Sequence, residues 1–406
     1  MELNQAQADI YCGIDISKDS FDFCFLTQNK EILHRDHLPM TRISFNQLIT
    51  LADKYVNEKV IFLMESTSTY HRRLQHFLEL KGCYVSVIMP LLINSFTKAC
   101  ILRNTKTDKK DALIIAEYGV VFWDKLRASS TIANDLRNLL RSYKFYVKER
   151  TRIKVKLKEA MVNCFPELAQ KIDVCCVTAL NFLLNCCTPS EIKSKQLRTL
   201  EKLLTSTSGR KLSVSALEVK EMARTSIGTP DQFAQFTISH LVNSLLETTS
   251  RIKEFEKKLN EVTDELFKEE KEILTSVRGI GNTLAIGFLI EIVDVNNYKN
   301  WKQLCAFAGL DPGKKESGSS IKHNGKISKK GNKYLRSDMF VMAQRVTTFC
   351  ERYKEYKLKK MREGKTGKQA LIAVANKLIK LLFYMLKNGV YFEDNYENNL
   401  LASRGV

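Results

Sequence analysis

Acidic residues are scarce for the number of basic ones in this chain of 406 residues. Asp and Glu total 45 against 64 Lys and Arg, which leaves a formal net charge of +19. A surplus of this size favours a polyanionic partner, with nucleic acid ahead of an anionic membrane surface. The alternative is a soluble protein that is merely basic. With 44% hydrophobic and 27% charged residues, the composition is globular, and the length suggests two or three domains.

Long apolar runs and secretory features are also missing. No apolar stretch approaches the roughly 18 residues of a membrane span, so we expect no membrane partner. The opening residues MELNQAQADIYCG have neither the basic start nor the apolar stretch of a signal peptide. We therefore expect a cytoplasmic protein.

Zinc-binding patterns are absent as well. The chain has no C-x-x-C motif, and its six histidines do not pair with cysteines at the spacing of zinc ligands. Its 11 cysteines include the doublets Cys175-Cys176 and Cys186-Cys187. We expect reduced, mostly buried thiols. The sequence assigns no role to the segment 175–215 around them.

The first 130 residues change repeatedly between strand and helix patterns. Apolar and polar residues alternate on both sides of a turn at 17–20, which predicts a hairpin of strands 11–16 and 21–26. Three strands followed by alternating helices and strands are the order of a ribonuclease-H-like (RuvC-like) α/β fold. The other expected elements are a strand in EILHRDHLP, a helix around 45–56, a buried strand 59–65, a helix closed by Gly82, a strand 84–90 and a helix holding Asp108 and Asp111.

Four carboxylates fall where that fold holds metal ions. Asp15 lies in the first expected strand, and Glu65 ends the fourth. Asp108 and Asp111, three residues apart, share one face of the late helix. Such hard oxygen ligands suit Mg²⁺ or Mn²⁺, and two ions ~4 Å apart can clamp the attacking and leaving oxygens of a phosphodiester. The plainer alternatives are a turn cap for Asp15 and a residue favoured by the helix dipole for Asp108.

The middle of the chain, 131–272, is predicted to be helical. A basic helix covers 134–168, and a second long helix covers about 235–274. Apolar residues of the second helix follow a/d spacing with Glu and Lys between them, which favours a coiled coil. The apolar stripe either pairs between copies, as an oligomerisation region, or packs on its own domain, and the two long helices could also pair with each other within one chain. The a/d residues are Leu245, Ile252, Phe255, Leu259, Val262, Leu266 and Ile273.

The C-terminal part, 273–390, is predicted to be mostly helical and to precede a tail, 391–406. A helix–GIG–helix turn at Gly279 and Gly281 presents backbone N–H groups suited to a phosphate, although such turns also serve tight packing. Between 314 and 336, eight Lys and Arg stand against one acid, and we expect a loop laid on a phosphate backbone. The expected nucleic-acid contacts are Lys106, Lys109 and Lys110 beside the acidic pair, and Gly279, Gly281, Lys322, Lys326, Lys329, Lys330, Lys333 and Arg336.

Both ends of the chain resemble one family. Asp15 and Glu65, followed by KTDKKDA, resemble the DEDD signature of insertion-sequence transposases of the IS110 group, recombinases that include the Piv-type DNA invertases. SVRGIGNTLAIGFLIEI, QLCAFAGLDP and ESGSSIKHNGKISKKGNKYLR resemble the C-terminal transposase domain of that group. The resemblance implies a RuvC-like domain, a coiled-coil region and a C-terminal domain with a nucleophilic serine, in a prokaryotic, nucleoid-associated protein.

The resemblance also implies roles and partners. The four acids would be catalytic and bind Mg²⁺ or Mn²⁺. Ser317, which precedes Gly318, fits the family serine best, and Ser319 and Ser320 are alternatives. That serine would form a covalent phosphoserine link to DNA. The implied partners are donor and target double-stranded DNA, an element-encoded bridge RNA, and a second copy in a homodimer that assembles into a tetramer.

Two other functions remain compatible with these residues. A metal-dependent, structure-specific endonuclease of the junction-resolving type would need the acids but no serine. A nucleic-acid-binding protein without catalysis would need neither the acids nor the serine.

Overall fold

The structure is a computed structural model, and the chain divides into two compact units, Met1–Asp135 and Leu136–Val406. The described residues are 8–55, 58–66, 69–100, 108–126, 128, 131–205, 211–230, 232–317 and 321–393.

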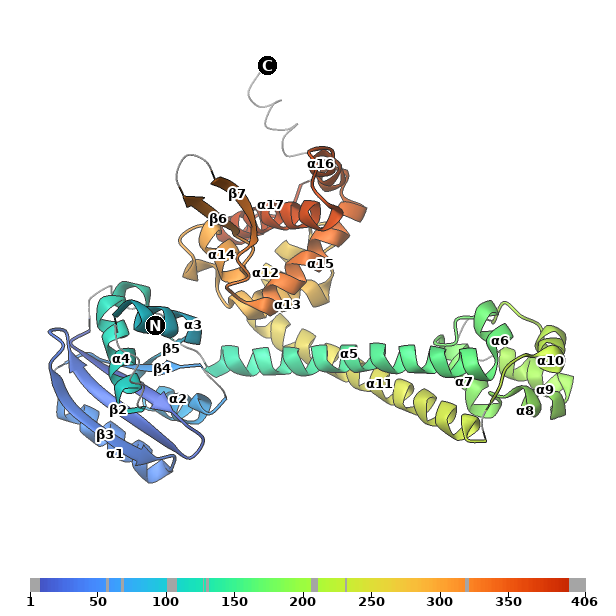
Figure 1. Ribbon diagram of the computed structural model, residues 1–406, viewed down its shortest axis with the longest axis horizontal. Helices are drawn as coiled ribbons and strands as arrows, with labels where there is room; N and C mark the ends of the chain where they lie inside the picture. The colour runs from blue at the N-terminus through green and yellow to red at the C-terminus, as the bar shows by residue number, and fades with distance from the viewer. Residues whose placement is uncertain are drawn as a thin grey trace, which may run out of the picture. The chain divides into compact units, whose positions relative to one another are not determined.

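The first unit is built on a five-stranded sheet (Figure 1). Its strands are β1 (Ile10–Ile16), β2 (Ser20–Thr27), β3 (Ile32–Pro39), β4 (Val60–Glu65) and β5 (Tyr84–Ile88). They lie in the order β3-β2-β1-β4-β5, with β1–β2 and β2–β3 antiparallel and β1–β4 and β4–β5 parallel. The predicted hairpin is confirmed, and the Ser17 N–H donates to the Ser20 carbonyl at 3.0 Å across its turn.

Helices cover both faces of this sheet. They are α1 (Arg42–Ala52), α2 (His71–Leu80), α3 (Pro90–Cys100) and α4 (Asp108–Val121), with short 3-10 turns η1 (Asp53–Tyr55) and η2 (Trp123–Lys125). Because side chains alternate along a strand, Ile14 of β1 packs with residues of α1 and α2, whereas Tyr11 packs with residues of α4. Helix α3 was not predicted: Pro90 was expected to end a strand, but it is the first residue of a helix, where its missing N–H costs no hydrogen bond.

Two long helices dominate the second unit, α5 (Thr131–Cys164) and α11 (Ala234–Leu266), and they pair within one chain (Figure 1). The Tyr143 hydroxyl donates to Glu256 at 2.9 Å, and the rings of Tyr146 and Phe255 lie 5.3 Å apart. Of the alternatives left open by the a/d pattern, pairing inside the chain is therefore observed. Pairing between copies stays a prediction.

The second long helix is shorter than predicted. It ends at Leu266, and α12 (Lys268–Thr275) begins two residues later. The residue between them, Phe267, has non-helical backbone angles, φ −143° and ψ 37°. Its ring packs against the apolar cores on both sides of the break. A partly buried aromatic residue with non-helical backbone angles therefore interrupts a stretch whose composition is helical throughout.

Five short helices fold between the long ones. They are α6 (Pro166–Lys171), α7 (Val177–Asn185), α8 (Pro189–Ser194), α9 (Leu197–Leu204) and α10 (Ala216–Thr225). Their shared core contains Cys164, Cys186 and Cys187. Burial raises the pKa of the Cys186 thiol to about 12 and also raises that of Cys187, so both remain neutral near pH 7. The ten described cysteines are free and largely buried, which confirms the prediction of buried thiols.

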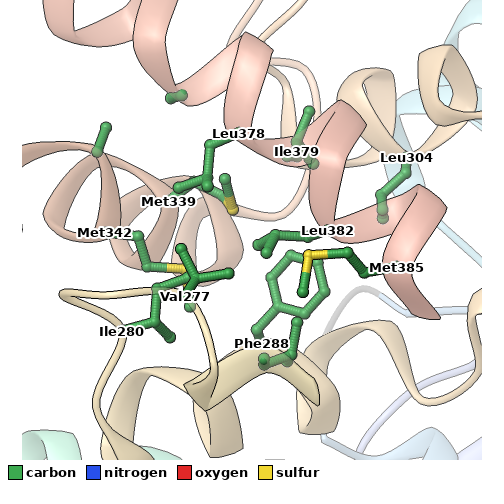
Figure 2. Packing of buried hydrophobic residues seen from close by; sticks show 14 of the residues in the cluster. Val277, Ile280, Phe288, Leu304, Met339, Met342, Leu378, Ile379, Leu382 and Met385 are labelled. Carbon is green, nitrogen blue, oxygen red and sulfur yellow. The ribbon is translucent and has the colours of Figure 1, made fainter. Parts of the chain in front are cut away.

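The C-terminal helices surround one apolar core (Figure 2). The remaining elements are α13 (Asn282–Ile292), η3 (Val295–Asn297), α14 (Trp301–Ala308), β6 (Pro312–Ser317), β7 (Ile321–Ile327), α15 (Lys333–Phe349), α16 (Glu351–Arg362) and α17 (Gly367–Asn388). Among the described helices, only α17 has the length and composition to cross a membrane. Leu378 and Leu382 of α17 are fully buried in the core with Phe288 of α13, so α17 serves as a core helix.

The basic stretch 314–336 is not the loop that was expected. It contains the antiparallel hairpin β6–β7 and the start of α15. Two bonds between Asp311 and Ser328 close the base of this hairpin: the Ser328 N–H donates to the Asp311 carbonyl at 2.9 Å, and its hydroxyl donates to the Asp311 carboxylate at 2.6 Å. The glycine, serine and lysine content suggested a loop. In the structure, the backbones of β6 and β7 pair with each other across the hairpin instead.

Candidate functional site

Asp15 and Glu65 lie at the same level of two neighbouring parallel strands. The last paired residues of β1 and β4 are Ile14 and Met64, so the next residue on each strand is a carboxylate. Both carboxylates belong to partly buried residues. Because alternate residues share a face, Asp15 lies on the same face as Tyr11, which is the face covered by α4. The backbone pairing therefore holds two carboxylates side by side on that face.

Helix α4 rests directly on β1 because residue 13 is glycine. A Cβ at Gly13 would lie 2.2 Å from the Ala112 carbonyl oxygen and 2.3 Å from the Ala116 nitrogen. No other residue type permits such a close approach of two backbones. Further along α4, Gly119 lies against the side chains of Tyr11 and Leu63. Glycines on both elements thus bring the helix down onto the sheet.

These contacts set the direction of α4 over the sheet. Residues 112–116 lie over Gly13, and Gly119 lies over Tyr11. Since the helix moves from Gly13 toward Tyr11 as the chain advances, its first turn lies toward the Asp15 end of β1. That first turn begins with Asp108 and contains Asp111. The fold therefore directs all four predicted acids to one end of the sheet.

The described side chains do not yet form a complete ligand set. Asp111 is partly buried, whereas the side chain of Asp108 lies outside the described part, as do those of Lys109 and Lys110. Lys106 lies outside the described residues altogether. Among the described residues, no group of three or more Asp, Glu, His or Cys side chains has metal-ligand geometry. The chemistry of the donor set, carboxylate oxygen only, fits Mg²⁺ or Mn²⁺.

One carboxylate of this face was missed by the sequence analysis. Asp22 of β2 is directly opposite Asp15 in the β1–β2 ladder and is only 8% exposed. Its Oδ2 lies 2.9 Å from Nδ1 of His37, the residue opposite it on β3. The sequence contained enough information to find it. If Ser17 and Ser20 close the turn, Ile16 pairs with Phe21 and Asp15 pairs with Asp22.

In the second unit, the GIG turn is shaped by packing. Gly279 has a φ of +99°, and a Cβ there would lie 3.0 Å from the Arg345 backbone. Ile280 is buried, and Figure 2 shows it with Val277 beside Met342 in the core. The tight-packing alternative therefore holds for Gly279, and the buried isoleucine fixes the turn in place.

A cavity opens at the same turn. Its volume is about 730 Å³, and Arg278, Asn282, Thr283, Arg345 and Phe349 are among the residues that line it. Gly281 precedes the first residue of α13, and a Cβ there would meet nothing within 4 Å. The cavity thus combines the positive end of a helix dipole with two exposed arginines, features that suit an anionic ligand.

Buried acids fix the neighbouring basic residues of the second unit. Glu291 is fully buried, and its carboxylate lies 3.7 Å from Arg137 Nε and 3.6 Å from Arg141 Nη2. The Asn332 amide donates to the same carboxylate at 2.6 Å. Asn332 also caps α15 by accepting from the Tyr334 N–H at 2.9 Å. Glu291 therefore ties α5 to the start of α15.

Another ion pair joins α5 directly to α15. Lys144 Nζ lies 2.6 Å from the carboxylate of Asp338, which is 8% exposed. Burial raises the pKa of Asp338, and the lysine opposes that rise. Lys144 is therefore the third cation of α5, after Arg137 and Arg141, that is held by a buried carboxylate.

The candidate serine lies at the tip of the β6–β7 hairpin. Ser317 is the last residue of β6, and its backbone pairs with Ile321. Its side chain, like those of Lys322 and Lys326, lies outside the described part, and Ser319 and Ser320 lie outside the described residues. The position of Ser317 is therefore known from its backbone pairing with Ile321 at the end of the hairpin.

Of the basic residues that follow the hairpin, Lys329, Lys330 and Lys333 are exposed. Arg336 is used inside the domain, where its Nη1 donates to the carbonyls of Ala308 and Lys329 at 3.2 and 3.3 Å. The exposed lysines thus remain available to an external anion, while the arginine also supports the base of the hairpin.

Comparison with known families matches both ends of the chain. Residues 12–166 match a family described as transposase, the DEDD transposase of IS110. Residues 271–358 match the transposase IS116/IS110/IS902 family. The two matches together cover more than half of the sequence. They define a DNA transposase, and the chain belongs to the IS110 group.

Individual relatives agree with this assignment. A pilin gene-inverting protein of Moraxella bovis is 25% identical over 393 residues, which covers 94% of this chain and 97% of that protein. An uncharacterized 43.6 kDa protein of insertion element IS110 from Streptomyces coelicolor is 26% identical over 71% of this chain and 72% of its own length. The transposase for insertion sequence element IS1111A of Coxiella burnetii is 23% identical over 92% of this chain and 88% of its own length.

Proposed function

We propose that this transposase cleaves and rejoins donor and target double-stranded DNA through paired acidic and serine sites. The observation that carries the proposal is the alignment of Asp15 with Glu65 on adjacent strands, beneath the helix that begins at Asp108. Carboxylates gathered at one end of a sheet suit phosphoryl transfer assisted by divalent ions. The likeness to a protein named for gene inversion supports DNA strand exchange as the outcome.

The first unit is proposed to be a ribonuclease-H-like (RuvC-like) domain. Three antiparallel strands followed by two parallel ones, in the order β3-β2-β1-β4-β5, support this fold. The candidate acids come from its first strand, its fourth strand and its last helix, α4. These are the positions that the sequence predicted for the metal ligands.

Asp15, Glu65, Asp108 and Asp111 would hold Mg²⁺ or Mn²⁺. The ion would polarise the scissile phosphate and favour loss of the proton from the attacking hydroxyl. The chain's own contribution is to hold the carboxylates in place: β1 and β4 fix Asp15 and Glu65 by backbone pairing, and Gly13 lets α4 approach them closely.

Ser317 is the proposed nucleophile. Its Oγ would attack the scissile phosphorus, the bond from phosphorus to the 3′ oxygen would break, and the 5′ phosphate would stay on the serine. The departing 3′ oxygen takes up a proton as the serine loses one. A 3′ hydroxyl of the exchanged strand then attacks the phosphoserine, and Ser317 leaves with its proton restored. The number of phosphoester bonds is unchanged, so no ATP is required. Ser319 and Ser320 are the alternatives, and single Ser→Ala variants at the three positions distinguish them.

The second unit is proposed to hold nucleic acid. The cavity at Gly281 with Arg278 and Arg345 would take a backbone phosphate, and exposed Lys329 and Lys330 would add phosphate contacts. An element-encoded bridge RNA is proposed to pair with donor and target DNA. Dimers that assemble into a tetramer would bring the acidic site of one subunit to the serine of another.

Recombination in vitro tests this function. A plasmid with the element junction and a target site is incubated with purified protein, Mg²⁺ and the RNA that copurifies with it. We expect Asp111→Asn and Ser317→Ala to lose recombination, and Ser250→Ala, an exposed serine on α11, to retain it. DNA cleavage without a protein–DNA adduct would favour the junction-resolving endonuclease. Intact nucleic-acid binding without Mg²⁺ binding would favour a protein without catalysis.

A further inference from the structure

A row of ionisable side chains crosses four strands of the first unit. In the β1–β2 ladder Asp22 is directly opposite Asp15, and in the β2–β3 ladder His37 is directly opposite Asp22. Glu65 lies beside Asp15 on the opposite side, on β4. Directly opposite residues of paired strands have their side chains on the same face. The row therefore extends the acidic pair on the face covered by α4.

Asp22 is the member of this row that the proposed function leaves without a role. It is 8% exposed, and a buried carboxylate is costly unless it has a partner. His37 supplies that partner from the β3 side, with Nδ1 2.9 Å from Oδ2. The histidine side chain itself is 53% exposed. The His37 imidazole therefore holds the Asp22 carboxylate from the β3 side, and the β1–β2 pairing places Asp15 on the other side of Asp22.

Three carboxylates, Glu65, Asp15 and Asp22, follow one another along the row. Side chains directly opposite on a ladder have Cβ atoms about 5 Å apart, and like charges there destabilise the sheet. The His37 imidazole hydrogen-bonds to Asp22, at 2.9 Å. The cation Arg35 lies one row further along β3, opposite Cys24. A divalent cation between Asp15 and Glu65 would relieve the repulsion within the row.

We propose that Asp22, held by His37, is a positioning residue that strengthens divalent-cation binding at Asp15 and Glu65. Mg²⁺ keeps several of its water molecules when a protein binds it, and those waters need acceptors in fixed places. Asp22 is such an acceptor beside the site. Outer partners of this kind typically contribute 10–100-fold to metal affinity. The inference rests on the proposed function, because it takes Asp15 as a ligand.

Calorimetric titration of the full-length, DNA-free protein with Mn²⁺ tests the inference. Asp22→Asn keeps the shape of the side chain and an oxygen that accepts from His37, and it should bind Mn²⁺ about 10–100-fold more weakly than the wild type. Asp36→Asn is the matched control: Asp36 precedes His37, is exposed, and lies opposite Phe23 on the other face. Its affinity should stay within about twofold of the wild type, because asparagine keeps the side-chain oxygen that accepts from the His37 backbone N–H at 2.7 Å and leaves the charges on the α4 face unchanged.

The histidine provides a second, independent pair of variants. His37→Asn retains an N–H donor near the position of Nδ1 and should keep most of the affinity. His37→Ala removes the donor and should weaken binding as Asp22→Asn does. The thermal unfolding midpoint, measured without metal, shows whether a variant binds Mn²⁺ weakly because Asp22 no longer positions the site or because the sheet is less stable. Because Asp22→Asn removes a like charge, it should melt no lower than the wild type.

Two results would overturn the inference, and they differ from each other. If the wild type binds Mn²⁺ and Asp22→Asn binds equally well, Asp22 has no positioning role, while the acidic metal site stands. If the wild type binds no Mn²⁺, the metal site of the proposed function fails, and the inference fails with it. In the first case, a lower melting midpoint of Asp22→Asn would assign Asp22 and His37 to the stability of the sheet only.

Discussion

Asp15 lies beside Glu65, one residue beyond the last pair of the parallel β1–β4 ladder. The ladder up to Ile14 and Met64 brings these two residues to the same level of adjacent strands. Placing like charges side by side costs stability, and proteins tolerate such costs where function needs them. The relationship therefore links strand register to the proposed chemistry.

Replacing Asp15 with asparagine should stabilise the protein and inactivate it. Removing one of the adjacent negative charges should raise the free energy of unfolding without metal by about 0.5–1 kcal/mol. Loss of a metal ligand should lower recombination at least about 100-fold, since the ion is worth several kcal/mol in the transition state. Urea unfolding and the plasmid assay measure the two effects. A variant that is less stable and fully active would refute the assignment of Asp15.

Replacing Gly13 with alanine should displace α4. The added Cβ would lie 2.2 Å from the Ala112 carbonyl oxygen, and overpacking of this kind typically costs about 1–3 kcal/mol. Because α4 carries Asp111, the affinity for Mn²⁺ should fall together with the melting temperature. Gly367→Ala, where a Cβ meets nothing within 4 Å, should change neither quantity. A Gly13→Ala protein with wild-type melting temperature and affinity would contradict the close approach of α4.

The stability of the α5–α11 pair should depend on Tyr143 at high pH. Burial and the Glu256 carboxylate raise the pKa of Tyr143 to about 12, against an ordinary value of about 10. A raised pKa means that the folded state favours the neutral phenol. The corresponding stability, roughly 3 kcal/mol, is therefore complete below pH ~10 and is lost as the pH rises toward 12.

Chemical denaturation of the wild type and Tyr143→Phe at pH 9 and pH 11.5 measures this effect. The wild type should lose more stability between the two pH values than Tyr143→Phe does. Tyr384→Phe is the control, because Tyr384 is 50% exposed and its removal should leave the pH dependence as in the wild type. Equal pH dependence in the wild type and Tyr143→Phe would count against the buried contact with Glu256.

Replacing Arg345 with glutamine should weaken DNA binding equally for all sequences. A cation that contacts a backbone phosphate contributes affinity without base specificity, and its loss should lower the salt-dependence slope by about 1. Fluorescence anisotropy at several salt concentrations, with specific and random duplexes, measures both quantities. Arg224→Gln, on the exposed surface of α10, should leave the slope unchanged. An unchanged slope for Arg345→Gln would remove the GIG cavity from the DNA interface.

Local patterns in the sequence were enough to predict much of the first unit. The alternation around Ser17–Ser20 predicted the β1–β2 hairpin, because a half-buried hairpin repeats every two residues. The order of the acids predicted which strand ends and which helix would carry them. The same turn also predicts that Asp15 pairs with Asp22. It does not predict that His37 of β3 lies opposite Asp22 and contacts its carboxylate.

Other features depended on contacts that no local pattern contains. Pro90 is compatible with the end of a strand and with the first turn of a helix, and only the fold decides between them. The a/d pattern predicts an apolar stripe on α11 but not whether α5 of the same chain or another copy covers it. The β6–β7 hairpin was missed because Asp311 and Ser328, which close it, are 17 residues apart.

Covalent capture of DNA shows whether Ser317 attacks the scissile phosphate. Purified protein, Mg²⁺, copurifying RNA and donor and target DNA are reacted and denatured, and the peptide joined to DNA is identified by mass spectrometry. We expect a 5′ phosphate attached to Ser317 in the wild type and no adduct in Asp111→Asn or Ser317→Ala. Full recombination by Ser317→Ala, with no adduct on Ser317 in the wild type, would contradict this expectation.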